Sequence, residues 1–402
     1  MNTADEVRLA RIALGCLAEP GNRDLGVLVR RCGPVDGLHR LLAGAVPARL
    51  AEAARLRLTG GERDATPDPA VSVRAARTLA ERLLTTADRL GARAVTPEDD
   101  EWPHQLDDLV HLSRAADGRT VERDTDPPNC LWVRGDPQLA GALDRSVAVV
   151  GARASSGYGT YVATDLAHGL AERGWTVVSG GAFGIDAAAH RAALAAGGVT
   201  VAVLACGVDR PYPVGHANLF DQIAEVGLLI SEWPFGSAPH RMRFLVRNRV
   251  IAAATRGTVV VEAAVRSGSR QTLGRARALG RRAMAVPGPV SSAMSVGCHA
   301  ELREEGTRLV SDHAEVIEEV GRIGDDLAPL PRGVHRPHDA LDPLASQLLD
   351  AVRPGRARSA EEIAAAAGVS GRDARRTLPR LIETGFVVEH DAGYRLAPGG
   401  TR

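Results

Sequence analysis

From Ser146 onwards, short runs of β-branched residues alternate with stretches of helical periodicity, and this alternation restricts the possible folds of the chain more than any other feature. The runs are VAVV (147–150), TVVS (176–179), VTVAVLA (199–205), GLLISE (227–232), TVVVE (258–262), AMAVP (283–287) and RLVS (308–311). Because these runs are apolar on both faces, they are typical of a parallel sheet covered by helices. We therefore predict an α/β protein with a Rossmann-like, doubly wound, mainly parallel sheet.

The pattern on either side of this segment predicts further domains. Apolar residues on one helical face, such as Leu9, Ile12 and Leu17, indicate helices near the N-terminus. Near the C-terminus, three helical stretches precede a hairpin that closes at Asp391-Ala392-Gly393, an order typical of a winged helix. The predicted divisions are a helical SAM-like module (1–85), an irregular lead-in (86–140) with an exposed insertion (115–126), the Rossmann-like domain (141–322), a linker (323–342) and a winged-helix domain (343–398).

Composition excludes several classes of protein. The chain is 45% hydrophobic and 24% charged, which is the balance of a globular protein. No apolar run approaches the roughly 20 residues of a membrane span, and the start of the chain lacks the pattern of a signal peptide. The five cysteines are scattered without metal-ligand spacing. We expect a cytoplasmic protein with reduced, mostly buried thiols, no membrane association, no metal and no cofactor.

Basic residues are concentrated in one segment although the net charge is zero. The chain contains no lysine, so all 49 basic residues are arginines. Residues 241–282 contain eleven arginines against one acid, Glu262. Such a local excess is the pattern expected of a surface that binds a polyanion.

Three Gly- or Ser-rich turns follow predicted strands, at the edge where open α/β sheets bind ligands. They are GARASSGYG (151–159), SGGAFGID (179–186) and RSGSR (266–270). The first differs from GxGxxG because arginine fills its third position, so a dinucleotide is not expected. Backbone N–H groups at such turns suit phosphate, although the glycines have the alternative role of making tight strand–helix connections. The candidate residues for binding a phosphate-bearing ligand here are Arg153, Ser156, Gly180, Gly181, Ser267, Gly268 and Ser269.

The stretch RMRFLVRNRVI (241–251) begins a predicted helix that is rich in arginine. Arg243 and Arg247 are four residues apart and have the spacing to follow a phosphate backbone. Arg249 lies about 200° around the helix from Arg247, so we expect one of them to bind phosphate and the other a carboxylate or a neighbouring subunit. Phe244 suits base stacking, with core packing as the alternative. Arg247 and Phe244 are therefore further candidates for binding a phosphate-bearing ligand.

Asp186 and His190 have the spacing of an acid–base pair on one helix face. We favour the interpretation that Asp186 caps the helix while His190 pairs with it or packs, because no nucleophile is evident nearby. No catalytic residue is predicted.

Seven motifs, in chain order, support a resemblance to a known family. They are GARASSGYG, SGGAFGIDAAAH, CGVDRPYPVGH, FLVRNRVIA, VVVEAAVRSGS, VPGPV and SVGCHAELREEG. Together they resemble the DNA-processing protein A (DprA, or Smf) family over about residues 95–320. The resemblance implies a homodimer, formed through the Rossmann-like domain, that binds single-stranded DNA. By the same resemblance, the predicted phosphate and base contacts fall on Arg153, Gly181, Arg241, Phe244, Arg247, Asn248, Ser267, Gly268 and Ser269. It further implies protection of incoming DNA in natural transformation and loading of RecA.

The chain departs from the family pattern at two places. Phe183 stands where the family usually has arginine, so one basic contact is expected to be missing. Arg270 and Gln271 follow Ser-Gly-Ser where the family commonly has two apolar residues. Arg270 is expected either to add a phosphate contact or to disturb the following helix.

Two other functions are compatible with parts of the sequence. A nucleotide phosphoribohydrolase of the lysine-decarboxylase-like group has a similar core. In such enzymes the glutamate follows the glycines of a PGGxGTxxE motif, whereas here Glu262 comes before the glycine. A regulator would use its winged helix as the principal DNA reader, yet residues 341–402 contain nine arginines against eight acids. The winged helix is therefore expected to be an accessory module.

Overall fold

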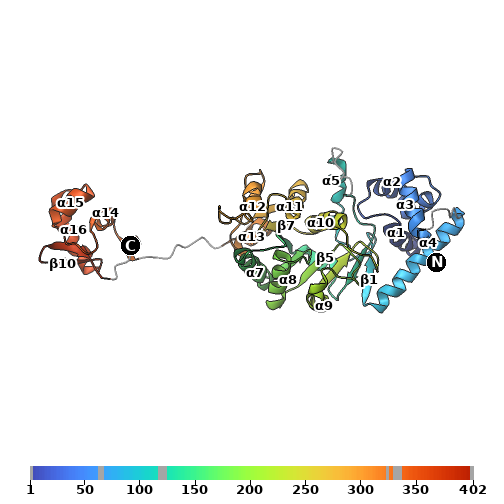
Figure 1. Cartoon of the computed structure of the whole chain (residues 1–402), viewed down its shortest axis with the longest axis horizontal. Coiled ribbons are helices and arrows are strands. Elements are labelled where there is room, and N and C mark those ends of the chain that lie inside the picture. The colour runs from blue at the N-terminus through green and yellow to red at the C-terminus, as the bar shows by residue number, and fades with distance from the viewer. Residues whose placement is uncertain (1–2, 62–67, 116–124, 323–325, 329–336, 399–402) are drawn as a thin grey trace. The chain divides into compact units, whose positions relative to one another are not determined.

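The computed structural model of the chain divides into two compact units, Met1–Ala328 and Pro329–Arg402 (Figure 1). It describes residues 3–61, 68–115, 125–322, 326–328 and 337–398. Each unit has a hydrophobic core of its own.

In the described part of the first unit, nine strands form one sheet in the order β1-β2-β6-β5-β4-β3-β7-β8-β9. The strands are β1 (Ala92–Val95), β2 (Leu131–Arg134), β3 (Ser146–Val150), β4 (Thr176–Ser179), β5 (Thr200–Leu204), β6 (Leu228–Ser231), β7 (Gly257–Val260), β8 (Arg282–Ala285) and β9 (Thr307–Leu309). Strands β3 to β9 pair in parallel, whereas β1 and β2 are antiparallel to their neighbours. The prediction of a mainly parallel α/β sheet is confirmed.

The strand order changes direction at β3. The chain proceeds from β3 through β4 and β5 to β6 on one side, and then returns to place β7 on the other side of β3. Val147 of β3 is in register with Val177 of β4 and with Gly257 of β7. Such a reversal separates the loops that follow the two central strands, and ligands bind in the crevice between them.

Helices cover both faces of the sheet (Figure 1). One face packs against α7, α8 and α13, and the other against α10 and α11. The helices of this segment are η1 (His104–Leu106), α5 (Leu109–Ala115), α6 (Leu139–Asp144), α7 (Gly157–Glu172), α8 (Ile185–Ala195), η2 (Val214–His216), α9 (Ala217–Val226), α10 (Arg241–Ala254), α11 (Gly268–Ala278), α12 (Val296–Glu301) and α13 (His313–Val320). Since the strands are buried on both faces, they need no polar alternation.

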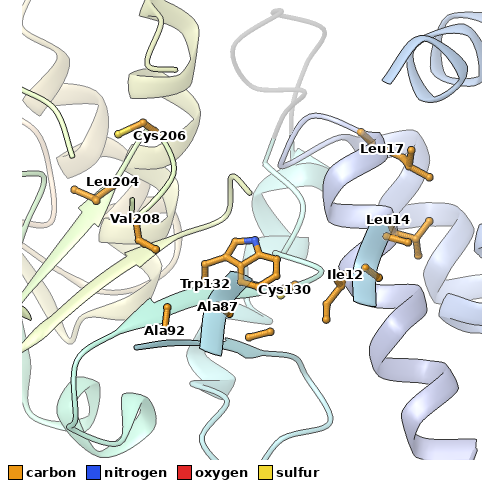
Figure 2. Packing of buried hydrophobic residues seen from close by; sticks show 14 of the residues in the cluster. Ile12, Leu14, Leu17, Ala87, Ala92, Cys130, Trp132, Leu204, Cys206 and Val208 are labelled. Atoms are coloured by element: carbon orange, nitrogen blue, oxygen red, sulfur yellow. The ribbon is translucent and has the colours of Figure 1, made fainter. Parts of the chain in front are cut away.

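An N-terminal group of helices packs against the β2 side of the sheet. It comprises α1 (Thr3–Leu17), α2 (Arg23–Leu42), α3 (Ala48–Leu58) and α4 (Pro69–Arg89). Figure 2 shows Trp132 of β2 among apolar side chains that include Ile12 and Leu14 of α1. A shared hydrophobic cluster therefore joins the helical module to the sheet. Helix α2 is kinked at Gly33, which has a φ of 80° and precedes Pro34.

The lead-in at 86–140 is not irregular, contrary to the prediction. It supplies β1 and β2, which extend the sheet beyond β6. The apolar sequence pattern was too short to reveal these strands, because each has only four residues and they pair antiparallel at an edge of the sheet. The predicted insertion at 115–126 falls mostly outside the described residues, and its last two residues, Thr125 and Asp126, are buried.

The second unit contains α14 (Pro343–Ala351), α15 (Ala360–Ala367) and α16 (Gly371–Glu383). An antiparallel hairpin of β10 (Val387–His390) and β11 (Gly393–Leu396) follows, with its turn where it was predicted. Ser359 and Glu362 form a capping box at the start of α15. This element order fits the predicted winged helix, which stays a prediction.

In the described residues, no helix is both long and apolar enough to cross a membrane. All five cysteines are free, and Cys130, Cys206 and Cys298 are buried.

Candidate nucleic-acid interface

A cleft of about 800 Å³ opens at the carboxyl edge of the sheet, beside the reversal between β3 and β7. Its walls are the turns that follow β3, β4, β5 and β7, together with the first turns of α10. The cleft is lined by eight of the predicted contact residues, namely Arg153, Arg241, Phe244, Arg247, Asn248, Ser267, Gly268 and Ser269. The fold therefore brings together residues that are more than one hundred positions apart in the chain.

Three exposed arginines give the cleft its charge. Arg153 follows β3, Arg241 begins α10, and Arg266 precedes α11. None of the three forms an ion pair with a described residue. Asp186 is the acid among the described lining residues, and its carboxylate is buried. The accessible charge is therefore positive, which favours an anionic ligand.

Most of the arginine excess at 241–282 has another role. Seven of its eleven arginines pair with acids from other segments: Arg243 with Glu19, Arg249 with Glu232, Arg256 with Asp144, Arg270 and Arg277 with Glu301, Arg281 with Asp108, and Arg282 with Glu319. The number of arginines in this segment therefore overstates the charge that is available to a polyanion, while Arg241 and Arg266 still line the cleft. Only tertiary contacts reveal which arginines are neutralised, because their partners are distant in sequence.

Helix α10 separates buried arginines from exposed ones. Arg249 is fully buried and makes a bidentate ion pair with Glu232, with N···O distances of 2.7 and 2.9 Å. This confirms the prediction that one of Arg247 and Arg249 binds a carboxylate. Arg243 does not follow a ligand backbone as predicted, because it donates to Glu19 at 2.9 Å and to the carbonyl of Ala238.

Arg247 forms the floor of the cleft and is only 4% exposed. Its guanidinium donates to the carbonyl oxygens of Gly180 and Val203 and to Oδ1 of Asn248. Burial lowers the pKa of Arg247 to about 10, so it still carries its charge at neutral pH. An added Cβ at Gly180 would lie 2.4 Å from this guanidinium, so Gly180 is needed for an internal contact. Neither Gly180 nor Gly181 lines the cleft.

Phe244 presents a half-buried ring between two arginines and a tyrosine. The Cζ atom of Arg153 lies 5.0 Å from the ring centroid, and that of Arg247 lies 6.0 Å from it. The Tyr212 ring is 5.8 Å away on the cleft wall. An aromatic surface beside cations suits a stacked base whose phosphate is bound alongside.

The start of α7 is occupied by an internal carboxylate, which corrects the prediction that it binds phosphate. Glu262 is buried, and it accepts hydrogen bonds from the backbone N–H of Ser156 at 2.9 Å and from its hydroxyl at 2.5 Å. Ser156 also caps α7 by accepting from the N–H of Gly159. Because a negative side chain already lies at this helix N-terminus, the predicted Ser156 contact lacks free donors, and Ser156 does not line the cleft.

The turn after β4 is also held by its own acid. Asp186 accepts from the N–H groups of Gly180 at 3.1 Å and Ala182 at 3.4 Å, while Gly184 is the N-cap of α8. His190 instead contacts Thr200, with 2.8 Å between Nδ1 and Oγ1. His190 does not pair with Asp186, but it is fully buried, which agrees with the alternative that it packs in the core. The predicted capping role of Asp186 is wrong, because Gly184 is the N-cap. The described residues contain no cluster of ligands that could hold a metal ion.

The start of α11, in contrast, remains open to the cleft. Ser267 caps this helix and accepts from the N–H of Ser269, and Gly268 and Ser269 line the cleft. Arg270 pairs with Glu301 at 2.8 Å, so it neither disturbs the helix nor points a free charge at the ligand. An exposed helix N-terminus beside Arg266 is a favourable position for phosphate.

His190 predicts a pH dependence of stability. Burial lowers the pKa of its imidazole from the ordinary 6.5 to about 3. Between these values the unfolded chain binds a proton at His190 that the folded protein excludes, so this contribution to stability is lost as the pH falls below 6.5. Replacing His190 by Gln should reduce the slope of unfolding free energy against pH by about 1.4 kcal/mol per pH unit. Urea unfolding across the acidic range measures this slope, and an unchanged slope would contradict the prediction.

Arg266 and Tyr212 are among the lining residues that were missing from the predicted contacts. Arg266 was counted in the arginine excess but not assigned to the site, and the sequence does not show that it lacks an acidic partner. Tyr212 was visible only as part of CGVDRPYPVGH, a motif after β5 whose loop reaches the cleft. The available signal was position: Arg266 lies in the predicted turn 266–270, and Tyr212 lies in the motif that follows the predicted strand 199–205.

Comparisons with known proteins agree with this architecture. Residues 93–321 match the family model described as DNA recombination-mediator protein A. A Mycobacterium tuberculosis protein that carries the DprA name is 47% identical over 298 residues, which is 74% of this chain and 71% of that protein. The DNA processing protein DprA of Streptococcus pneumoniae is 42% identical over 186 residues, which is 46% of this chain and 64% of that protein. An X-ray structure of DNA processing protein A from Streptococcus pneumoniae matches with a TM-score of 0.58 and 29% identity, covering 79% of this chain and 98% of that one.

Proposed function

We propose that this chain, which belongs to the DNA recombination-mediator protein A family, binds single-stranded DNA in the cleft beside β3 and β7. We further propose that it does so without catalysing a reaction. The observation that carries the proposal is that Arg153, Arg241 and Arg266 line the same cleft as Phe244, with Arg153 beside its ring. Cations bind the phosphates of any sequence, and an aromatic ring stacks on any base that is not already stacked in a duplex. The same cleft therefore selects a strand type without reading its sequence.

The chemistry of the cleft favours binding over catalysis. Asp186 and Glu262 are both buried and both accept internal hydrogen bonds. His190 faces Thr200 and has a pKa of about 3, far from the value that suits a general base at neutral pH. A phosphoribohydrolase needs a carboxylate within reach of the substrate ribose. The accessible polar groups of the described lining are arginines, hydroxyls, amides, backbone N–H groups and the imidazole of His240, with no accessible carboxylate among them.

A length series of oligonucleotides tests this proposal against the enzyme alternative. AMP should compete weakly with a fluorescent single strand, because one phosphate engages only part of the cleft, and affinity should rise as the competitor gains nucleotides. AMP and the strand should both remain chemically intact, as chromatography would show. Release of free base that is abolished by Glu262→Gln would favour the phosphoribohydrolase instead.

The proposal extends to protein partners and to a cellular role. The description of the family as a recombination mediator supports RecA as a partner to which the bound strand is passed. The names of the relatives support a role in DNA processing, and with it protection of incoming DNA during natural transformation. We include in the proposal a homodimer formed through residues 141–322, for which the family resemblance is the support.

A further inference from the structure

Phe183 is an exposed aromatic residue directly beside the cleft. It follows β4 and is adjacent to Ala182, which lines the cleft, and it is 52% exposed. Its ring packs at a steep angle against the buried ring of His216, with 4.4 Å between centroids. His216 is itself fixed, because its Nδ1 lies 3.0 Å from the carbonyl oxygen of Gly181. The exposed Phe183 ring is therefore held in place by its packing on His216.

Two exposed residues between β5 and α9, Tyr212 and Val214 of η2, extend this apolar surface. Tyr212 is 44% exposed and Val214 is 77% exposed, and an added Cβ at Gly215 would lie 3.4 Å from the Phe183 ring, so the loop runs against that ring. We call Phe183, Tyr212 and Val214 the aromatic rim. Tyr212 also lines the cleft and lies 5.8 Å from Phe244, which makes the rim continuous with the cleft.

We propose that the aromatic rim binds nucleobases of the same strand whose phosphates occupy the cleft, with Phe183 as a stacking residue. The inference rests on the proposed function and deepens it. The rim itself carries no charge, whereas the adjoining cleft carries Arg153, Arg241 and Arg266. A single strand matches this division, because it offers a charged backbone and flat apolar faces side by side. A duplex hides those faces in its stack.

The absence of a charge on the Phe183 side chain then has a specific consequence. A base stacked on Phe183 adds affinity without neutralising a phosphate, so it adds little to the salt dependence of binding. Phe183→Ala should therefore weaken binding of a single strand by roughly tenfold, as one base–aromatic contact does, while the slope of log affinity against log salt stays unchanged.

Fluorescence of Phe183→Trp reports directly on stacking at this position. The native tryptophans, Trp102, Trp132, Trp175 and Trp233, are all at most 2% exposed, so the new side chain is the accessible one. A single strand should quench its emission on binding. An abasic strand of the same length should bind without this quenching, because it retains the phosphates and lacks the bases.

Val226→Ala is the matched control. Val226 is 51% exposed and precedes β6, so it lies at the amino edge of the sheet, opposite the cleft. This variant should bind DNA as the wild type does. Phe183→Leu, which keeps apolar packing on His216, should lose affinity as Phe183→Ala does, and this separates stacking from support of the fold.

The outcomes distinguish this inference from the proposed function. Wild-type binding that Phe183→Ala and Phe183→Leu leave unchanged would overturn the rim proposal and leave the cleft proposal standing. Equal quenching of Phe183→Trp by the abasic strand would also overturn it. Failure of the wild type to bind any single strand would overturn both.

Discussion

Replacing Arg153, Arg241 and Arg266 together with alanine should reduce the affinity for a single strand by at least about 100-fold at low salt. Each arginine is exposed, lines the cleft and forms no ion pair with a described residue, so each is available to a phosphate. Charged hydrogen bonds are worth about 1.5–3 kcal/mol each, and a tenfold loss of affinity corresponds to about 1.4 kcal/mol. The slope of log affinity against log salt should fall by about 2, near 0.7 for each lost contact with a single strand.

The same triple variant should keep nearly the wild-type thermal midpoint, because exposed arginines without ion pairs contribute little to folding. Arg74, Arg173 and Arg191 are also exposed but do not line the cleft, and their triple alanine variant is the control of equal charge. Anisotropy titrations of both variants at several salt concentrations give affinity and slope. If the two variants lost affinity equally, overall charge rather than the cleft would explain the binding.

Replacing Arg249 by methionine should destabilise the protein by about 3–5 kcal/mol, the range measured when one partner of a buried ion pair is removed. Arg249 is 0% exposed and Glu232 4%, so the variant would leave a carboxylate buried without its cation. Urea unfolding measures the change in unfolding free energy.

The double variant Arg249→Met with Glu232→Gln should lose less stability than the sum of the two single variants, because no unpaired charge remains. A strictly additive result would contradict the account of α10 as a helix anchored by a buried ion pair. Since α10 also carries Arg241 and Phe244 into the cleft, its anchoring bears on binding as well as on folding.

The fold was predictable because its signal is local and repeated. Each apolar run from VAVV to RLVS became a strand of the parallel sheet, and the turns that follow the central strands meet at one edge as expected. The short antiparallel strands β1 and β2 were missed, since four residues at an edge carry no such repetition.

The site was only partly predictable because ion pairing is a property of the folded chain. The same arginine-rich helix contains Arg241, which is exposed, and Arg249, which is buried against Glu232. Nothing in the sequence around Ser156 shows that Glu262, more than one hundred residues later, fills the helix N-terminus there. A Gly-rich turn therefore predicts a place for a negative group, and the structure decides whether that group is a ligand or the chain's own carboxylate.

A competition titration on the full chain tests the central claim most directly. A fluorescent single strand of about 20 nucleotides is displaced by the unlabelled strand or by a duplex of the same sequence, at several salt concentrations, with the triple arginine variant as the reference for binding outside the cleft. We predict that the single strand competes at least about tenfold better than the duplex, that affinity falls as salt rises, and that the arginine variant loses this preference. Equal or tighter binding of the duplex by the wild type, with the variant unaffected, would contradict the proposal that the cleft binds single-stranded DNA.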